Sequence, residues 1–228
     1  MAISTAGKVV LSVIVTGLSR RLMRRAVGAA IGMGAAGYSV DYQSSFVDAT
    51  RDDIGVEVSE YYLNALDEVE YNPGCELCDI ELFDVRDTLP YVGVFPTRPI
   101  ESITTLYFHH TAADTLTPWS VIAKIGYQRG LGGMPYHWGL PRSGRIEILQ
   151  HLEFRTNHTA GHNTHGCSAV FPGNYENYEL NDKQKEAVEK LRRIARWLGI
   201  EEEKIHKEVK PTACPGKYAA KWLLQSRS

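Results

Sequence analysis

The sequence HKEVKPTACPG at residues 206–216 is the most informative stretch of the chain, because it decides how the rest is interpreted. His206 and Cys214 stand at the two ends of a short, proline-containing loop. Neutral imidazole and thiolate are ligands that Zn²⁺ prefers, so the two side chains can hold one metal ion together. A third ligand must come from elsewhere, and His109, at the end of the apolar run that starts at Ile103, is the best candidate. Three protein ligands leave one position open for water, which is typical of a catalytic zinc site.

Four other segments complete a pattern along the chain: FHHTA (108–112), PYHW (135–138), NHTAGHN (157–163) and FPGNY (171–175). Together with residues 206–216, and in this order, they resemble the zinc-dependent N-acetylmuramoyl-L-alanine amidases. That family includes small phage amidase-lysozymes and animal peptidoglycan recognition proteins. One such match alone is a weak signal, whereas all of them in the family's order are a strong one.

The resemblance implies an α/β fold with a central mixed β-sheet flanked by helices, and the strand patterns agree with it. Residues 103–109 and 166–171 have the apolar, β-branched and aromatic content of strands. Residues 136–140 and 145–149 flank a turn at 141–144, which predicts a β-hairpin.

Helices are expected between and after these strands, at residues 118–128, 182–198 and 216–225. The first begins with proline, which suits the first helical position. The second is preceded by NDKQ at 181–184, which resembles a capping box, and it ends before Gly199.

The resemblance also implies roles for individual side chains. It assigns the metal to His109, His206 and Cys214. Tyr136 would orient the zinc-bound water or take its proton. Thr212, which replaces the lysine of phage members, would donate a hydrogen bond to the developing oxyanion. The substrate contacts that we expect are His110, His137, His158 and Asn163.

The other histidines offer alternative metal sites. His109 and His110 are adjacent on a strand, where side chains alternate between faces, so only one of them can enter the site; the motif selects His109. A rival metal cluster would consist of His158, His162 and His165. Gly161 argues against a helix there, and no glutamate follows His158 as metalloprotease chemistry requires.

Composition divides the chain into unequal parts. With 228 residues, 43% of them hydrophobic, the chain can bury a substantial core, and a net charge of −2 argues against a general nucleic-acid binder. We expect an N-terminal extension over residues 1–98 and a catalytic domain over residues 99–228. The extension is expected to be largely helical and comprises a basic segment at 1–40, an acidic segment at 41–87 with a helix near 58–69, and a proline-containing linker at 88–101.

Residues 1–40 have more than one interpretation. The apolar run at 9–18 precedes most of the basic residues, the reverse of a cleavable secretory signal, and it is too short to cross a bilayer alone. Packed helices are one interpretation. The other is a segment for self-association or for contact with a membrane or a virion. The nearby pair Cys75 and Cys78 is compatible with a disulfide, half of a metal site, or neither.

The resemblance implies a peptidoglycan hydrolase that cleaves the amide between N-acetylmuramic acid and L-alanine with a zinc-activated water. It would bind one Zn²⁺ per chain, take peptidoglycan as its partner and act at the bacterial cell wall. A phage enzyme for lysis or for penetration of the wall is one interpretation of the extension. The alternative is a non-catalytic peptidoglycan-binding module or a virion structural protein. Catalytically inactive members lack the cysteine or the tyrosine, so Cys214 and Tyr136 favour the enzyme.

Overall fold

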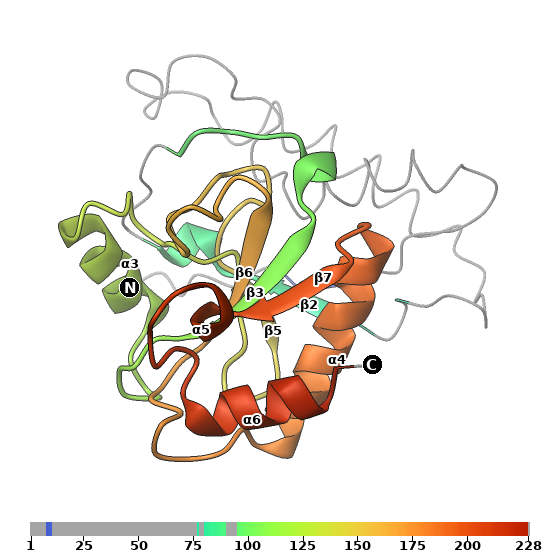
Figure 1. The fold of residues 1–228 in the computed structure, drawn as a ribbon. Coiled ribbons are helices and arrows are strands. Elements are labelled where there is room, and N and C mark those ends of the chain that lie inside the picture. The colour runs from blue at the N-terminus through green and yellow to red at the C-terminus, as the bar shows by residue number, and fades with distance from the viewer. Residues whose placement is uncertain (1–7, 11–76, 78–79, 90–94, 228) are drawn as a thin grey trace.

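The computed structural model describes residues 8–10, 77, 80–89 and 95–227. A seven-stranded mixed sheet, flanked by helices, forms its centre (Figure 1). The strands are β1 (Lys8–Val10), β2 (Glu81–Asp84), β3 (Thr105–His110), β4 (Trp138–Gly139), β5 (Ile146–Ile148), β6 (Gly166–Phe171) and β7 (Glu202–Ile205). Their order across the sheet is β1-β2-β5-β4-β6-β3-β7. The predicted α/β fold with a mixed central sheet is confirmed.

Parallel pairing dominates the middle of this sheet. β3 pairs in parallel with both β6 and β7, and β4 runs parallel to β6. β4 and β5 pair antiparallel, as the hairpin prediction requires, and the N–H of Gly144 closes their turn on the carbonyl of Pro141 at 3.0 Å. At the other side, β2 runs parallel to β5 and antiparallel to β1.

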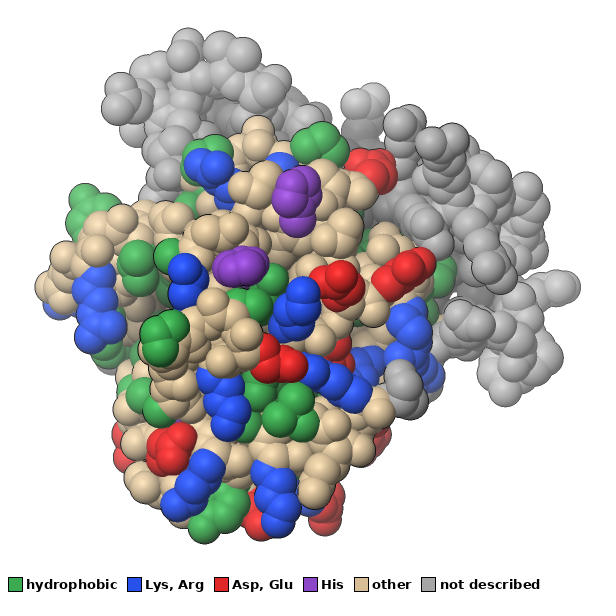
Figure 2. Space-filling view, viewed as in Figure 1, with side chains coloured by type: hydrophobic (Ala, Val, Ile, Leu, Met, Phe, Trp, Pro, Cys, Tyr) green, Lys and Arg blue, Asp and Glu red, His purple; other side chains and the backbone are tan. Residues whose placement is uncertain are grey.

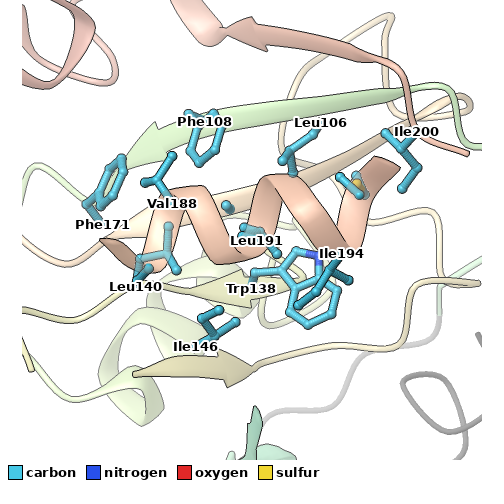
Figure 3. Close-up of a cluster of buried hydrophobic side chains, with 14 of the residues drawn as sticks. Leu106, Phe108, Trp138, Leu140, Ile146, Phe171, Val188, Leu191, Ile194 and Ile200 are labelled. Carbon is cyan, nitrogen blue, oxygen red and sulfur yellow. The ribbon is translucent and has the colours of Figure 1, made fainter. Parts of the chain in front are cut away.

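Both central strands, β3 and β6, are buried along their whole length because side chains pack on both faces of the sheet. On one face, Phe108 and Phe171 join the main apolar cluster (Figure 3). On the other face, Val170 joins a second cluster with Leu149 and Ile122. The alternation of side chains along a strand therefore supplies two cores from one sheet.

The helices are α3 (Trp119–Gln128), α4 (Asp182–Trp197), α5 (His206–Val209) and α6 (Lys217–Gln225), with 3₁₀ turns η1 (Arg86–Thr88) and η2 (Ile100–Ser102). α4 starts with the predicted capping box, in which the N–H of Gln184 donates to Oδ1 of Asn181 at 2.9 Å. Val188, Leu191 and Ile194 of α4 pack on the main cluster (Figure 3). α3 covers the second cluster, and it begins one residue later than predicted because Pro118 is its N-cap. Within the described ranges, no helix is long and apolar enough to cross a membrane.

The N-terminal extension needs one correction. The helical expectation for residues 1–40 is wrong at Lys8–Val10, which form β1. Two consecutive valines favour extended backbone, and β2 offers an unpaired edge to which they add. The helix expected near 58–69 and the pair Cys75 and Cys78 lie outside the described residues, as does the rest of residues 1–40.

The expected boundary between residues 98 and 99 stays a prediction, and the position of β2 suggests an earlier one. β2 lies inside the sheet, between β1 and β5. Ile80 and Leu82 are fully buried in the main cluster, and Leu77 is 6% exposed there. These side chains belong to the same core as the rest of the sheet, so we propose that the catalytic unit begins at or before Leu77.

Candidate metal centre

Two neighbouring strands bring the histidines of the candidate metal centre together. β3 and β7 are parallel, and Phe108 is paired with Ile205. His109 directly follows Phe108, and His206 directly follows Ile205. Their side chains therefore lie together at the C-terminal ends of these two strands. Their ring centroids lie 4.7 Å apart. His109 is 1% exposed, whereas His206, at the start of α5, is half-buried.

Cys214 reaches the same edge from the loop that follows α5. The backbone N–H of His110 donates to its Sγ at 3.3 Å, and the N–H of Lys207 donates to its carbonyl at 3.1 Å. Sγ of Cys214 then lies 3.6 Å from Nδ1 of His109. The donor atoms of His109, His206 and Cys214 all lie within 4.8 Å of one another.

The chemistry and spacing of this donor set fit a zinc ion. Zinc lies about 2.0–2.3 Å from its N and S ligands, which separates tetrahedral ligand atoms by roughly 3.3–3.8 Å. A small contraction of the present spacing satisfies that range. In the described part of the chain, no other set of three His, Cys, Asp or Glu side chains has converging donor atoms. The rival cluster of His158, His162 and His165 is therefore not assembled.

Burial sets the protonation states of the three candidate ligands. It lowers the pKa of His109 well below 6.5 and also lowers that of His206, so both imidazoles are neutral at pH 7. Neutral imidazole is the form that binds a metal. Burial raises the pKa of the Cys214 thiol to about 12, so this thiol must release its proton when a metal binds.

Tyr136 and Thr212 lie next to these ligands in different ways. The ring centroid of Tyr136 is 5.3 Å from that of His109. Burial raises the pKa of Tyr136 above its usual range, which keeps the phenol protonated and able to donate a hydrogen bond. Thr212 is exposed, and its Oγ1 accepts the N–H of Cys214 at 3.2 Å.

The predicted substrate contacts are more buried than expected. His137 is fully buried: Ser168 N–H donates to its Nδ1 at 3.1 Å, and its Nε2 donates to the carbonyl of Phe154 at 2.9 Å. Substrate contact by His137 stays a prediction, and in this structure both of its ring nitrogens bond inside the protein.

The other three expected contacts differ among themselves. His110 is 7% exposed, and its Nδ1 accepts the N–H of Tyr175 at 3.2 Å. His158 is also 7% exposed and lies against His109, with ring centroids 5.3 Å apart. Direct substrate contact is thus disfavoured for both. Asn163 is half-buried, and its Oδ1 accepts the N–H of Thr159 at 2.7 Å.

Arg98 supports the loop that carries these residues, and sequence reasoning missed it. It is 8% exposed, and its guanidinium donates to the carbonyls of Asn163 and Thr164, and to that of Leu152 at 3.3 Å. Burial lowers the pKa of Arg98 to about 10, so it remains a cation near neutral pH. It stands in the proline-containing linker, where no local pattern marks an arginine as buried.

A polar hollow of about 220 Å³ lies near the start of β3 and β7, and none of the three candidate ligands lines it. Tyr107 connects the hollow and the metal centre, because its ring packs against His158 and its hydroxyl lies 3.3 Å from Nδ1 of His162. On the face seen in Figure 2, histidine side chains lie near both basic and acidic side chains. The hollow is lined by Thr105, Tyr107, Gly161, His162, Thr164, His165, Glu202 and Lys204.

Comparisons with known proteins give the family and the fold of the chain. A family model described as N-acetylmuramoyl-L-alanine amidase matches residues 98–217. No curated protein matches the chain. Among solved structures, the N-acetylmuramoyl-L-alanine amidase LysC from Clostridium intestinale URNW is 23% identical with a TM-score of 0.56, covering 64% of this chain and 95% of that chain. Bumblebee PGRP-SA is 20% identical with a TM-score of 0.55, covering 64% and 94%. Wild-type Drosophila PGRP-LB is 18% identical with a TM-score of 0.54, covering 64% and 93%. These likenesses show the shared fold.

Proposed function

Since the chain belongs to the N-acetylmuramoyl-L-alanine amidase family, we propose that it is a zinc-dependent peptidoglycan hydrolase. It cleaves the amide between N-acetylmuramic acid and the L-alanine of the stem peptide. The observation that carries this proposal is the convergence of two neutral imidazoles and a thiol beside the phenol of Tyr136. A set of three protein ligands leaves a coordination position open, as catalytic zinc sites require.

His109, His206 and Cys214 hold the metal in this proposal. When bound, zinc supplies Lewis-acid activation of a water molecule and of the amide carbonyl. Tyr136 orients the attacking water, because its protonated phenol donates a hydrogen bond. The oxygen of Thr212 already accepts the N–H of Cys214, so its own O–H is left to donate to the developing oxyanion.

In this proposal the substrate extends from the metal centre to the polar hollow near the start of β3 and β7. Hydroxyls, imidazoles and the pair of Lys204 and Glu202, whose charged atoms are 2.9 Å apart, line this hollow. Such a lining suits a polar peptide better than an apolar ligand. Asn163 remains the proposed substrate contact among the residues expected from the sequence.

The reaction product tests the activity. Digestion of purified peptidoglycan should release peptides with a new N-terminal alanine and leave the glycan strands uncut, as mass spectrometry can measure. Glycosidases need a pair of carboxylates beside the sugar bond, and the assembled site contains none among its key residues. New reducing sugar ends would contradict the amidase, and wild-type protein that binds peptidoglycan without cleaving it would favour the non-catalytic alternative.

The metal is tested separately by a matched pair of cysteine variants. Protein purified without chelator should contain about one zinc per chain, and Cys214→Ala should lose most of it. Cys167→Ala is the control, because Cys167 is 1% exposed in the main cluster, away from the donor atoms. Equal zinc content in the two variants would contradict the assignment.

The biological setting of the reaction is part of the proposal. We propose a role in lysis or in penetration of the cell wall, with residues 1–40 mediating self-association or contact with a membrane or virion. Flotation with liposomes and light scattering of the full chain, compared with a chain that starts at Leu77, test this second part.

A further inference from the structure

We propose that His158 is a positioning residue: it sets the tautomer of His109, so that Nδ1 of His109 faces the metal centre as a lone pair. This inference rests on the proposed zinc site and deepens it. The signal is a directed series of hydrogen bonds behind the metal centre, formed by the carbonyl of Gly166, the ring of His158, the hydroxyl of Thr159 and the ring of His109.

The series begins at the carbonyl of Gly166, which can only accept. Nε2 of His158 lies 3.2 Å from this oxygen, so Nε2 must carry the proton. His158 is 7% exposed, and a neutral imidazole has a single N–H. Its Nδ1 is therefore an acceptor.

Glycine is required at this point for the carbonyl to approach. A Cβ on Gly166 would lie 2.6 Å from Cε2 of Tyr107 and 2.7 Å from the carbonyl oxygen of His162. Any side chain would push β6 away from β3 or displace the loop that holds His158. The glycine at the first position of β6 therefore allows the hydrogen bond that begins the series.

Three atoms meet at the next step. Nδ1 of His158 lies 2.9 Å from Oγ1 of Thr159 and 3.3 Å from Nε2 of His109, and the latter two atoms are also 3.3 Å apart. Thr159 has only one proton to donate. If Nε2 of His109 lacked a proton, two ring lone pairs would face each other with a single hydroxyl proton between them. A proton on Nε2 of His109 satisfies both neighbours, since it can donate to Nδ1 of His158 or to Oγ1 of Thr159.

The consequence lies on the other side of the His109 ring. With the proton on Nε2, Nδ1 is unprotonated and lies 3.6 Å from Sγ of Cys214. The opposite tautomer would direct an N–H into the metal centre and abolish ligation through Nδ1. A ligating histidine is commonly held by an acceptor on its second nitrogen. Here that acceptor is a buried imidazole, which also accounts for the burial of His158.

Two variants of His158 separate this role from packing. His158→Asn keeps an acceptor near the position of Nδ1 but cannot reach Gly166. His158→Gln places its amide near Nε2, where it can donate to Gly166 but leaves Nε2 of His109 without its acceptor. Zinc affinity, measured by competition with a chelator on the full chain, should fall roughly 10–100-fold in His158→Gln and stay near wild type in His158→Asn. Equal losses in both variants, or none in either, would overturn the proposal.

A spectroscopic measurement reads the tautomer itself. Long-range ¹H–¹⁵N correlation spectra of histidine-labelled full chain, with zinc and after its removal, should show His109 and His158 both protonated at Nε2. In metal-free His158→Gln, His109 should shift towards protonation at Nδ1. Wild-type His109 protonated at Nδ1 would overturn the inference. Failure of the wild type to bind zinc would instead refute the proposed zinc site, because the tautomer is measured independently of the metal.

Discussion

His109, near the end of β3, contacts two different environments. One of its ring nitrogens faces the candidate metal centre, and the other faces buried polar groups. The same strand position thus decides both ligation and the protonation of the ligand. Tyr136 approaches the ring of His109 from another element, with centroids 5.3 Å apart. The chemistry of the site therefore depends on a few side chains held at strand ends by buried contacts.

Tyr136→Phe separates catalysis from folding at this scale. The substitution removes one hydroxyl and little volume, so the protein should remain folded and zinc-loaded. Because the protonated phenol orients water in the proposed reaction, turnover should fall roughly 10²–10⁴-fold. Steady-state rates on soluble peptidoglycan fragments measure this loss. Tyr218→Phe is the control, since Tyr218 is half-buried on α6. A normal turnover rate in Tyr136→Phe would contradict the proposed role of the hydroxyl and leave Tyr136 with a packing role only.

The three side chains proposed as ligands were predicted from the sequence, whereas the buried residues behind them were not. His109, His206 and Cys214 are brought together, because strand ends and a short loop preserve the motif's geometry. The internal roles of His137 and His158 depend instead on how residues 157–165 fold over β3. No local spacing encodes that contact, so an exposed and a buried histidine look alike in the sequence.

The helices and strands that were predicted correctly are those with the strongest local sequence patterns. β6 occupies the predicted residues 166–171, and α4 begins at its predicted capping box. β7 was missed because its sequence, EEKI, has three charged residues and only Ile205 is buried. β2, with the sequence ELFD, was missed for a similar reason, since it lies in the acidic segment that we assigned to the extension.

β2 gives a prediction about where a truncated chain can begin. A chain starting near Val85 contains every assigned chemical residue, because all of them follow Ser102. That chain lacks β2 and the buried side chains of Ile80 and Leu82. Burying each such side chain contributes roughly 1.5–3 kcal/mol, so losing both removes a large part of the roughly 5–15 kcal/mol that stabilises a typical domain.

We therefore expect a chain starting at Val85 to aggregate or to melt without cooperativity, whereas a chain starting at Leu77 melts cooperatively. Calorimetry or circular dichroism of the two chains measures the difference. Leu82→Ala in the full chain should reduce the free energy of unfolding by about 2–5 kcal/mol. Identical cooperative melting of both truncated chains would contradict the place of β2 in the core.

At the scale of the whole molecule, the sheet separates two apolar cores, and the metal centre lies at an edge where parallel strands end. Several histidines are buried around this arrangement, although histidine gains charge readily just below neutral pH. Burial lowers the pKa of His137 well below 6.5 and that of His151 to about 4. Arg98 beside His137, and Arg86 beside His151, further disfavour the protonated rings.

These pKa values predict that the metal-free protein loses stability on acidification. The unfolded chain binds protons at its histidines as pH falls through about 6.5, whereas the folded chain does not until much lower pH. Stability is therefore complete above about pH 6.5 and is lost as pH falls towards 4. Each buried histidine contributes a slope of about 1.4 kcal/mol per pH unit in that window. Burial raises the pKa of Glu147 and Glu153, which opposes the trend as the carboxyl range is approached.

Urea unfolding midpoints of the chelated protein between pH 7.5 and 5 measure this slope. His151→Gln is the informative variant, because His151 contacts Arg86 and Phe154 rather than the metal ligands. The free energy of unfolding of this variant should depend less steeply on pH than that of the wild type. The difference in slope should be at most about 1.4 kcal/mol per pH unit, the contribution of one histidine. Zinc-loaded protein should resist acid until its ligands protonate, since metal binding favours the folded state. A midpoint that stays constant or rises between pH 6.5 and 5 would contradict the neutral, buried state of these histidines.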